Sequence, residues 1–122
     1  MATILVVEDD KNQRVLYEDE LKEEGYHVIL AKDGREAVRK VRDNKIDLVV
    51  LDIRMPGADG VETLSNIIAV NKKVPVILNT AYTSYKDNFM TWAAEKYIVK
   101  SSDLSELKKS IKEILDRKKP GE

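Results

Sequence analysis

Hydrophobic residues in this chain gather in five short runs that are separated by longer segments of mixed polarity. The runs are rich in Val, Ile and Leu, and they cover residues 3–7, 26–31, 46–51, 76–79 and 96–99. Short runs of this composition favour β-strands. The run at 46–51 is nearly all apolar, which is typical of a strand that is covered on both faces of its sheet.

The segments between and after these runs have the spacing of amphipathic helices. They predict helices over about residues 11–24 and 84–94, one that begins near Asp33, one that carries Val61, Leu64, Ile67 and Ile68, and one that opens at Ser102 or Asp103. The last has the clearest period, formed by Leu104, Leu107, Ile111, Ile114 and Leu115. Strands that alternate with helices in this way predict an α/β fold with parallel strands and right-handed crossovers.

Polar residues close four of the apolar runs. They are Glu8-Asp9-Asp10 after the first run, Asp52 after the third, Thr80 after the fourth and Lys100 after the fifth. In an open parallel sheet, ligands bind at the carboxyl ends of the strands. Acids, a hydroxyl and an ammonium at one such edge predict a site for a metal ion and a phosphoryl group.

The residue types at this edge suit phosphoryl chemistry. Mg²⁺ prefers oxygen ligands, and Glu8, Asp9 and Asp52 could supply them. A carboxylate such as that of Asp52 can attack a phosphoryl group to give an acyl phosphate. Lys100 offers a point charge, and Thr80 a hydroxyl donor, for the oxygens of the transferring group.

Composition limits the range of functions. The chain has 122 residues, which suits one domain over residues 1–122. Its net charge of -1 argues against a direct nucleic-acid surface. It has no cysteine, no amino-terminal segment like a signal peptide, and no apolar stretch near the roughly 18 residues that a membrane span needs. We therefore expect a cytoplasmic protein, if the source is bacterial, that makes no membrane contact.

Four motifs in this order resemble the receiver domain of bacterial two-component response regulators. They are residues 4–10, residues 51–57 with Asp59-Gly60, residues 79–81 and residues 97–100, so that the resemblance covers essentially the whole chain. It implies a CheY-like fold of five parallel strands in the order 2-1-3-4-5, with helices on both faces. It also implies a phosphohistidine donor on a histidine kinase or phosphotransfer protein, and a downstream protein that the sequence does not name.

The resemblance also assigns roles to individual residues. Asp52 corresponds to the phosphoacceptor, and Thr80 and Lys100 to the pair that grips the phosphoryl group. The Mg²⁺ ligands would be Asp9 directly, Glu8 through water, Asp52 and the backbone carbonyl of Arg54. Tyr97 corresponds to the aromatic switch that turns inward when the threonine moves.

The chain departs from the family pattern in the second half. The family usually has a cis proline after the lysine, whereas Ser101 follows Lys100 here. A cis bond before a non-proline residue costs about 3–4 kcal/mol, so we expect a trans bond. The segment from Thr80 to Lys100 looks about two residues short, and Ala93 stands where a glycine is usual, so the helix at 84–94 should be short or displaced.

Two large side chains flank the expected phosphoryl site, Arg54 two residues after Asp52 and Tyr82 two residues after Thr80. By analogy with the family, they would screen the acyl phosphate from water, so that self-dephosphorylation would be slow. Beyond catalysing its own phosphorylation and this slow decay, the chain is not expected to be an enzyme.

Two other functions stay open from the sequence. A pseudo-receiver would bind partners without phosphotransfer, and the missing proline is compatible with it. A phosphatase resembling haloacid dehalogenases would also use an aspartyl phosphate, Mg²⁺, a hydroxyl and a lysine. That family needs a second acid two residues after the nucleophile, and this chain has Arg54 there.

Overall fold

Parallel strands alternate with helices along the chain, as the hydrophobic pattern predicts. The computed structural model describes residues 1–52, 58–81 and 93–117. In this part the elements are β1 (Thr3–Val7), α1 (Lys11–Glu23), β2 (His27–Ala31), α2 (Gly34–Asp43), β3 (Leu48–Leu51), α3 (Ala58–Val70), β4 (Val76–Thr80), β5 (Lys96–Val99) and α4 (Ser105–Arg117). The predicted helix at 84–94 falls almost wholly on residues 82–92, which lie outside the described residues.

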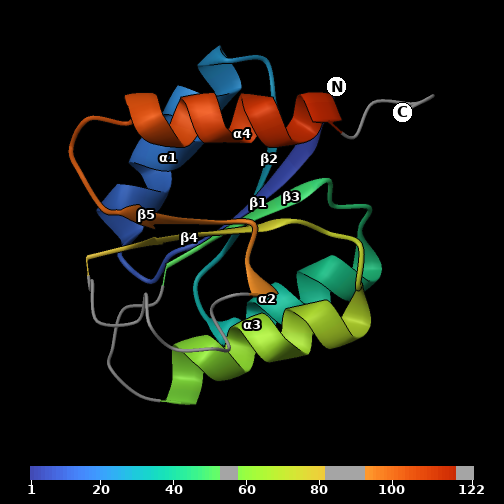
Figure 1. Ribbon diagram of the computed structural model, residues 1–122. Coiled ribbons are helices and arrows are strands. Elements are labelled where there is room, and N and C mark those ends of the chain that lie inside the picture. The colour runs from blue at the N-terminus through green and yellow to red at the C-terminus, as the bar shows by residue number, and fades with distance from the viewer. Residues whose placement is uncertain (53–57, 82–92, 118–122) are drawn as a thin grey trace.

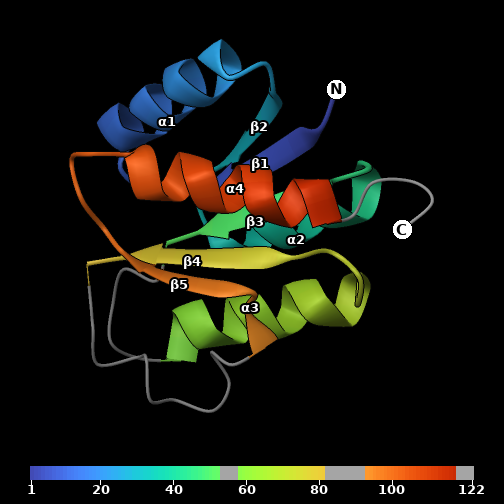
Figure 2. The ribbon, with the colours of Figure 1, turned by 45° about the horizontal axis from the view of Figure 1, so that its top comes forward.

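The five strands form one parallel sheet in the order β2-β1-β3-β4-β5. The predicted strand order is therefore confirmed. Helices α1 and α4 cover one face of the sheet, and α2 and α3 cover the other (Figure 1). Strands β2 and β5 form the two edges, and β5 lies beside β4 (Figure 2).

The core has two layers because each strand sends alternate side chains to opposite faces. In β4, Val76 and Leu78 pack into the layer under α2 and α3. Ile77 packs into the layer under α1 and α4. The residues of β1 and β3 alternate in the same way, so that every central strand contributes to both layers.

Side-chain caps fix where the first two helices begin. The Asp10 carboxylate accepts the backbone N–H groups of Asn12 and Gln13 at the start of α1. Asp33 does the same for Glu36 in α2, where the sequence predicts the start of a helix. After α1 the chain reverses at Gly25, whose φ of 94° is costly for any residue with a Cβ.

Several element boundaries differ from the predicted ones, and the two largest differences are at β3 and α4. Strand β3 begins at Leu48 rather than at residue 46, since Asp47 is engaged with the start of β1, where its carboxylate accepts the N–H of Thr3 at 2.7 Å. Helix α4 begins at Ser105 rather than at 102 or 103. There the Asp103 carboxylate accepts the N–H of Ser105 at 2.9 Å, which forms a turn before the helix.

Candidate functional site

The register of the sheet brings the ends of the central strands to one level. Val7 lies opposite Leu51, and Leu51 lies opposite Leu78. Glu8 and Asp52 follow Val7 and Leu51 directly, so both leave the sheet side by side, and the N–H of Asp52 donates to the carbonyl of Val7 at 3.1 Å. The expected convergence at the carboxyl edge is thus present for the acids.

Three carboxylates form a cluster at this edge. Glu8, Asp9 and Asp52 each offer an oxygen, and these oxygens lie within 4.8 Å of one another. Glu8 is buried, Asp52 half-buried and Asp9 exposed, so that the cluster opens to solvent on one side. An all-oxygen set with an open side fits Mg²⁺, which keeps several of its waters.

Lys100, which directly follows β5, joins this cluster. Its Nζ lies 2.6 Å from Oε1 of Glu8 and 3.0 Å from Oδ2 of Asp52. The second oxygen of Glu8 accepts the N–H of Asp10 at 3.1 Å. The ammonium therefore balances part of the negative charge that three close acids build up.

Burial and ion pairing both act on the pKa values of this group. Burial raises the pKa of the Glu8 carboxyl, against the hydrogen bonds from Lys100 and Asp10. Burial acts to lower the pKa of Lys100, but its hydrogen bonds to Glu8 and Asp52 outweigh it, so this pKa is raised. Lys100 is thus held in its charged form at the site.

Thr80 and Tyr97 come from β4 and β5, the two strands that lie beyond β3 in the sheet. Thr80 ends β4 and is fully buried, and its carbonyl accepts the backbone N–H of Lys100 at 2.7 Å. Tyr97 is half-buried and packs against the core layer under α2 and α3. Thr80 is thus tied through the backbone to the residue that contacts Asp52.

The bond between Lys100 and Ser101 is trans, because the described residues contain no cis peptide. The sequence prediction for this bond is confirmed. After it, the Ser101 hydroxyl accepts the N–H of Asp103 at 3.1 Å, and this turn leads into α4. Lys100 therefore reaches Asp52 and Glu8 without a cis bond.

Two predicted site residues cannot be placed. Arg54, expected as a metal ligand through its carbonyl, and Tyr82, expected to screen the phosphoryl site, both lie outside the described residues.

Sequence reasoning missed Arg14, which lies in α1. Its Nη1 donates to the carbonyls of Glu8 at 2.8 Å and of Asp9 at 2.9 Å. One guanidinium nitrogen thus holds the backbone of the loop that carries two of the clustered acids. The available signal was an arginine in the second turn of a helix that directly follows an acidic run.

A second missed feature is a buried polar pair. Asn79 Nδ2 donates to the hydroxyl oxygen of Tyr17 at 3.0 Å, and burial is the largest cause that raises the pKa of this phenol. The signal was an asparagine at the end of the apolar run Val76-Ile77-Leu78.

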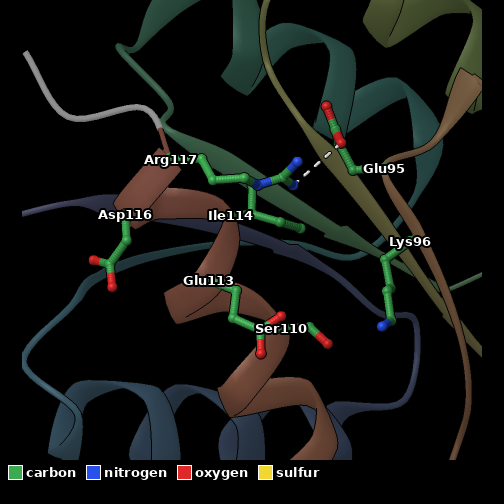
Figure 3. A pocket seen from close by; sticks show the side chains of 7 residues that line it. All are labelled: Glu95, Lys96, Ser110, Glu113, Ile114, Asp116 and Arg117. Atoms are coloured by element: carbon green, nitrogen blue, oxygen red, sulfur yellow. Dashed lines mark hydrogen bonds and ion pairs between the residues drawn. The ribbon is translucent and has the colours of Figure 1, made fainter. Parts of the chain in front are cut away.

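Figure 3 shows a separate hollow, whose lining includes none of the clustered acids. It has a volume of about 620 Å³ and lies between the start of β5 and α4. Arg117 of α4 reaches across it to Glu95, with 3.4 Å between Nη2 and Oε2. Because this hollow lies at the amino end of β5, it takes no part in the site at the carboxyl edge.

The comparison with known families agrees with this geometry. Residues 4–112 match the model of the response regulator receiver domain. This chain belongs to that family. It is a receiver domain of the kind found in two-component response regulators, and both the predicted family and the predicted fold are confirmed.

The receiver domain resembles one part of a longer curated protein. It is 37% identical over 114 residues to the transcriptional regulatory protein ZraR of Escherichia coli K12, a match that covers 92% of this chain and 26% of ZraR. The chain thus spans about a quarter of the length of that relative.

Two solved structures resemble the receiver domain over nearly all of its length. One is the response regulator TrrA of Thermotoga maritima in complex with Mg²⁺-BeF, with a TM-score of 0.87, 44% identity, and coverage of 93% of this chain and 99% of that one. The other is the histidine kinase ThkA in complex with TrrA, with a TM-score of 0.86, 44% identity, and coverage of 94% and 99%.

The described residues include no helix that is both long enough and apolar enough to cross a membrane.

Proposed function

We propose that this receiver domain accepts a phosphoryl group on Asp52 from a phosphohistidine of a histidine kinase or phosphotransfer protein, with Mg²⁺ bound. The observation that carries the proposal is the contact of Lys100 with Asp52 at 3.0 Å, within a cluster that includes Glu8 and Asp9. The similarity to TrrA, solved with Mg²⁺-BeF and with a histidine kinase, supports it.

The cofactor in this proposal is Mg²⁺, held by Glu8, Asp9, Asp52 and the carbonyl of Arg54. It would supply positive charge for the phosphoryl oxygens. The donor set fits this ion, because three carboxylate oxygens lie within 4.8 Å of one another. In the structure the ammonium of Lys100 forms ion pairs with two of these acids, Glu8 and Asp52. A bound cation and Lys100 would therefore both contact these two carboxylates.

The chemical step belongs to Asp52. One of its carboxylate oxygens attacks the phosphorus and forms the new O–P bond. The P–N bond to the donor imidazole breaks, and its electron pair returns to the imidazole nitrogen. Lys100 and Thr80 then bind oxygens of the transferred group, where fixed positive charge and a hydroxyl donor act on the developing negative charge.

The new phosphoryl group would shift the conformation of the domain. In the proposal it draws Thr80 and Lys100 inward, Tyr97 turns into the vacated space, and a downstream protein reads the change. Residues 1–122 would act as one domain, in the cytoplasm. Arg54 and Tyr82 would shield the acyl phosphate, so that the domain removes its own phosphoryl group slowly.

Incubation with acetyl phosphate and Mg²⁺, followed by intact mass measurement, tests the proposal. The expected result is the gain of one phosphoryl group, which Asp52→Asn abolishes. No gain in the wild-type chain would favour a binding module without phosphotransfer. Steady turnover of a phosphomonoester would instead favour a phosphatase.

A further inference from the structure

A buried hydrogen bond joins α1 to the carboxyl end of β4. Asn79 Nδ2 donates to the hydroxyl oxygen of Tyr17 over 3.0 Å, and each residue is only 3% exposed. Tyr17 lies in the apolar layer under α1 and α4. A buried amide destabilises the fold unless it is hydrogen-bonded, so the phenol of Tyr17 satisfies a group that otherwise lies among apolar side chains.

The two partners belong to different halves of the site. Tyr17 lies on α1, the helix that follows the acids Glu8 and Asp9. Asn79 immediately precedes Thr80 in β4, and the carbonyl of Thr80 accepts the N–H of Lys100 at 2.7 Å. One side-chain bond thus connects the segment with the metal-binding acids to the segment that would bind the phosphoryl group.

We propose that Tyr17 and Asn79 are a positioning pair, whose hydrogen bond fixes the place of Thr80 and Lys100 relative to the acidic cluster. Neither residue touches the reacting atoms. The pair acts by holding the carboxyl end of β4 against α1. This inference rests on the proposed function, because the reaction that the pair would serve is phosphoryl transfer to Asp52.

The charges of the site also reach the phenol. Burial is the largest cause and raises the pKa of the Tyr17 phenol, while the charge of Lys100 and the hydrogen bond from Asn79 lower it, and the charges of Glu8 and Asp52 raise it. The hydroxyl of Tyr17 therefore lies within electrostatic range of the site.

Three variants separate positioning from packing. Tyr17→Phe removes only the hydroxyl, and Asn79→Leu removes only the amide. The double variant replaces a bonded polar pair by two apolar side chains, a change that can leave stability nearly unaltered. We expect each single variant to lower both the melting temperature and the rate of phosphorylation, and the double variant to regain the melting temperature alone.

The rate is measured at saturating acetyl phosphate, across a titration of Mg²⁺. Small misplacement of catalytic groups lowers a rate strongly, so we expect a loss of about tenfold in the double variant. The Mg²⁺ concentration for half-maximal rate should stay as in the wild type, since the three acids follow β1 and β3, whose pairing the two substitutions leave in place. A double variant that regains the wild-type rate together with stability would overturn the inference.

Tyr26→Phe is the matched control. Tyr26 packs against the same apolar layer but precedes β2, an edge strand that is separated from β4 by β1 and β3. It should keep the wild-type rate. A loss equal to that of Tyr17→Phe would show a general effect of removing a phenol and would also overturn the inference.

A second measurement does not depend on phosphoryl transfer. The amide resonances of Thr80 and Lys100 should shift in the double variant and should exchange their protons faster than in the wild type, whereas wild-type resonances and exchange would overturn the inference. If the wild-type chain takes up no phosphoryl group on Asp52, the proposed function fails, and these resonances still decide whether the pair positions Thr80 and Lys100.

Discussion

Lys100 and Glu8 form an ion pair across the end of the sheet, with 2.6 Å between Nζ and Oε1. The Glu8 carboxylate is only 2% exposed, and the same ammonium lies 3.0 Å from Asp52. Two acids from neighbouring strands therefore depend on one cation from a third. Removal of that cation should change both the stability of the fold and its response to pH.

Lys100→Met should destabilise the protein by about 2 kcal/mol near neutral pH, because a buried carboxylate loses its charged partner. Burial already raises the pKa of Glu8, and loss of the ammonium would raise it further. A carboxyl whose pKa is raised on folding stabilises the fold at pH values below its pKa in the unfolded chain. This stabilisation is lost as the pH rises through its pKa in the folded protein. Urea unfolding at pH 5 and pH 8 should thus show a variant that is relatively weaker at pH 8.

Added Mg²⁺ should restore part of the stability of Lys100→Met, because a cation at the acids replaces the lost charge. Lys96→Met, at an exposed lysine at the start of the same strand, is the control and should show neither effect. Equal destabilisation of Lys100→Met at both pH values would contradict the role given to this ion pair.

Arg14→Ala should weaken Mg²⁺ binding about fivefold, since the loop of Glu8 and Asp9 loses two hydrogen bonds to its carbonyls, worth about 1 kcal/mol in net terms. Isothermal titration of Mg²⁺ measures this effect. The loss of a nearby positive charge acts in the opposite direction, so a variant that binds Mg²⁺ more tightly would show that charge outweighs loop geometry. Arg39→Ala, which removes an exposed arginine of α2, should leave binding unchanged.

Gly34→Ala should destabilise the fold by about 1–3 kcal/mol, the usual cost of forcing an extra carbon into a packed interface. A Cβ at Gly34 would collide with Oγ1 of Thr63, so the Thr63 side chain or the packing of α2 against α3 would have to shift. Denaturant unfolding measures the change.

The clash predicts a specific rescue of Gly34→Ala. Thr63→Ala in the same chain removes the oxygen that the new Cβ would meet and should recover most of the loss. Gly25→Ala is a different case, since nothing lies within 4 Å of a Cβ there and any cost comes from its φ of 94°. A Gly34→Ala loss that Thr63→Ala leaves in place would show that the contact is not its cause.

Asp103 should make the start of α4 sensitive to acid. Hydrogen bonds from Ser105 lower the pKa of this carboxyl below its ordinary value of 3.8. Its contribution to stability is then present above that ordinary value and is lost as pH falls through the lower, folded value. NMR titration of Asp103 between pH 2 and about 5 follows the carboxyl directly.

Asp103→Asn provides the matched variant, because the amide oxygen can still accept the N–H of Ser105 but does not titrate in this range. In Asp103→Asn, the stability of α4 should show no change in acid that comes from residue 103. In Asp103→Ala, the turn before α4 should be absent at every pH. An Asp103 that titrates at or above 3.8 in the folded protein would contradict the prediction.

The acids could be placed from the sequence because their position depends only on where two strands end. A run of apolar residues followed by Glu8, and another followed by Asp52, are local patterns, and parallel pairing brings such ends to one edge. The pairing of Val7 with Leu51 confirms this step. The alternation of strands with helices predicted the parallel α/β sheet, and the strand order followed from the resemblance to receiver domains.

The remaining features depend on contacts between residues far apart in the chain. The bond between Tyr17 and Asn79 spans 62 positions, and neither residue alone indicates the other. The reach of Arg14 back to Glu8 and Asp9 depends on its side-chain conformation. The late start of α4 reflects competition between a turn at Asp103 and a helix that could begin there, and helical periodicity does not resolve that competition.

Asn79 and Thr80 are adjacent in β4 and therefore face opposite layers of the molecule, the amide toward Tyr17 and the hydroxyl away from it. Inserting or deleting a single residue within this strand would exchange the two faces. The amide would then enter the layer under α2 and α3, and the threonine would face α1. Evolutionary changes in chain length near the site should accordingly occur in the connections between elements and spare the interior of β4.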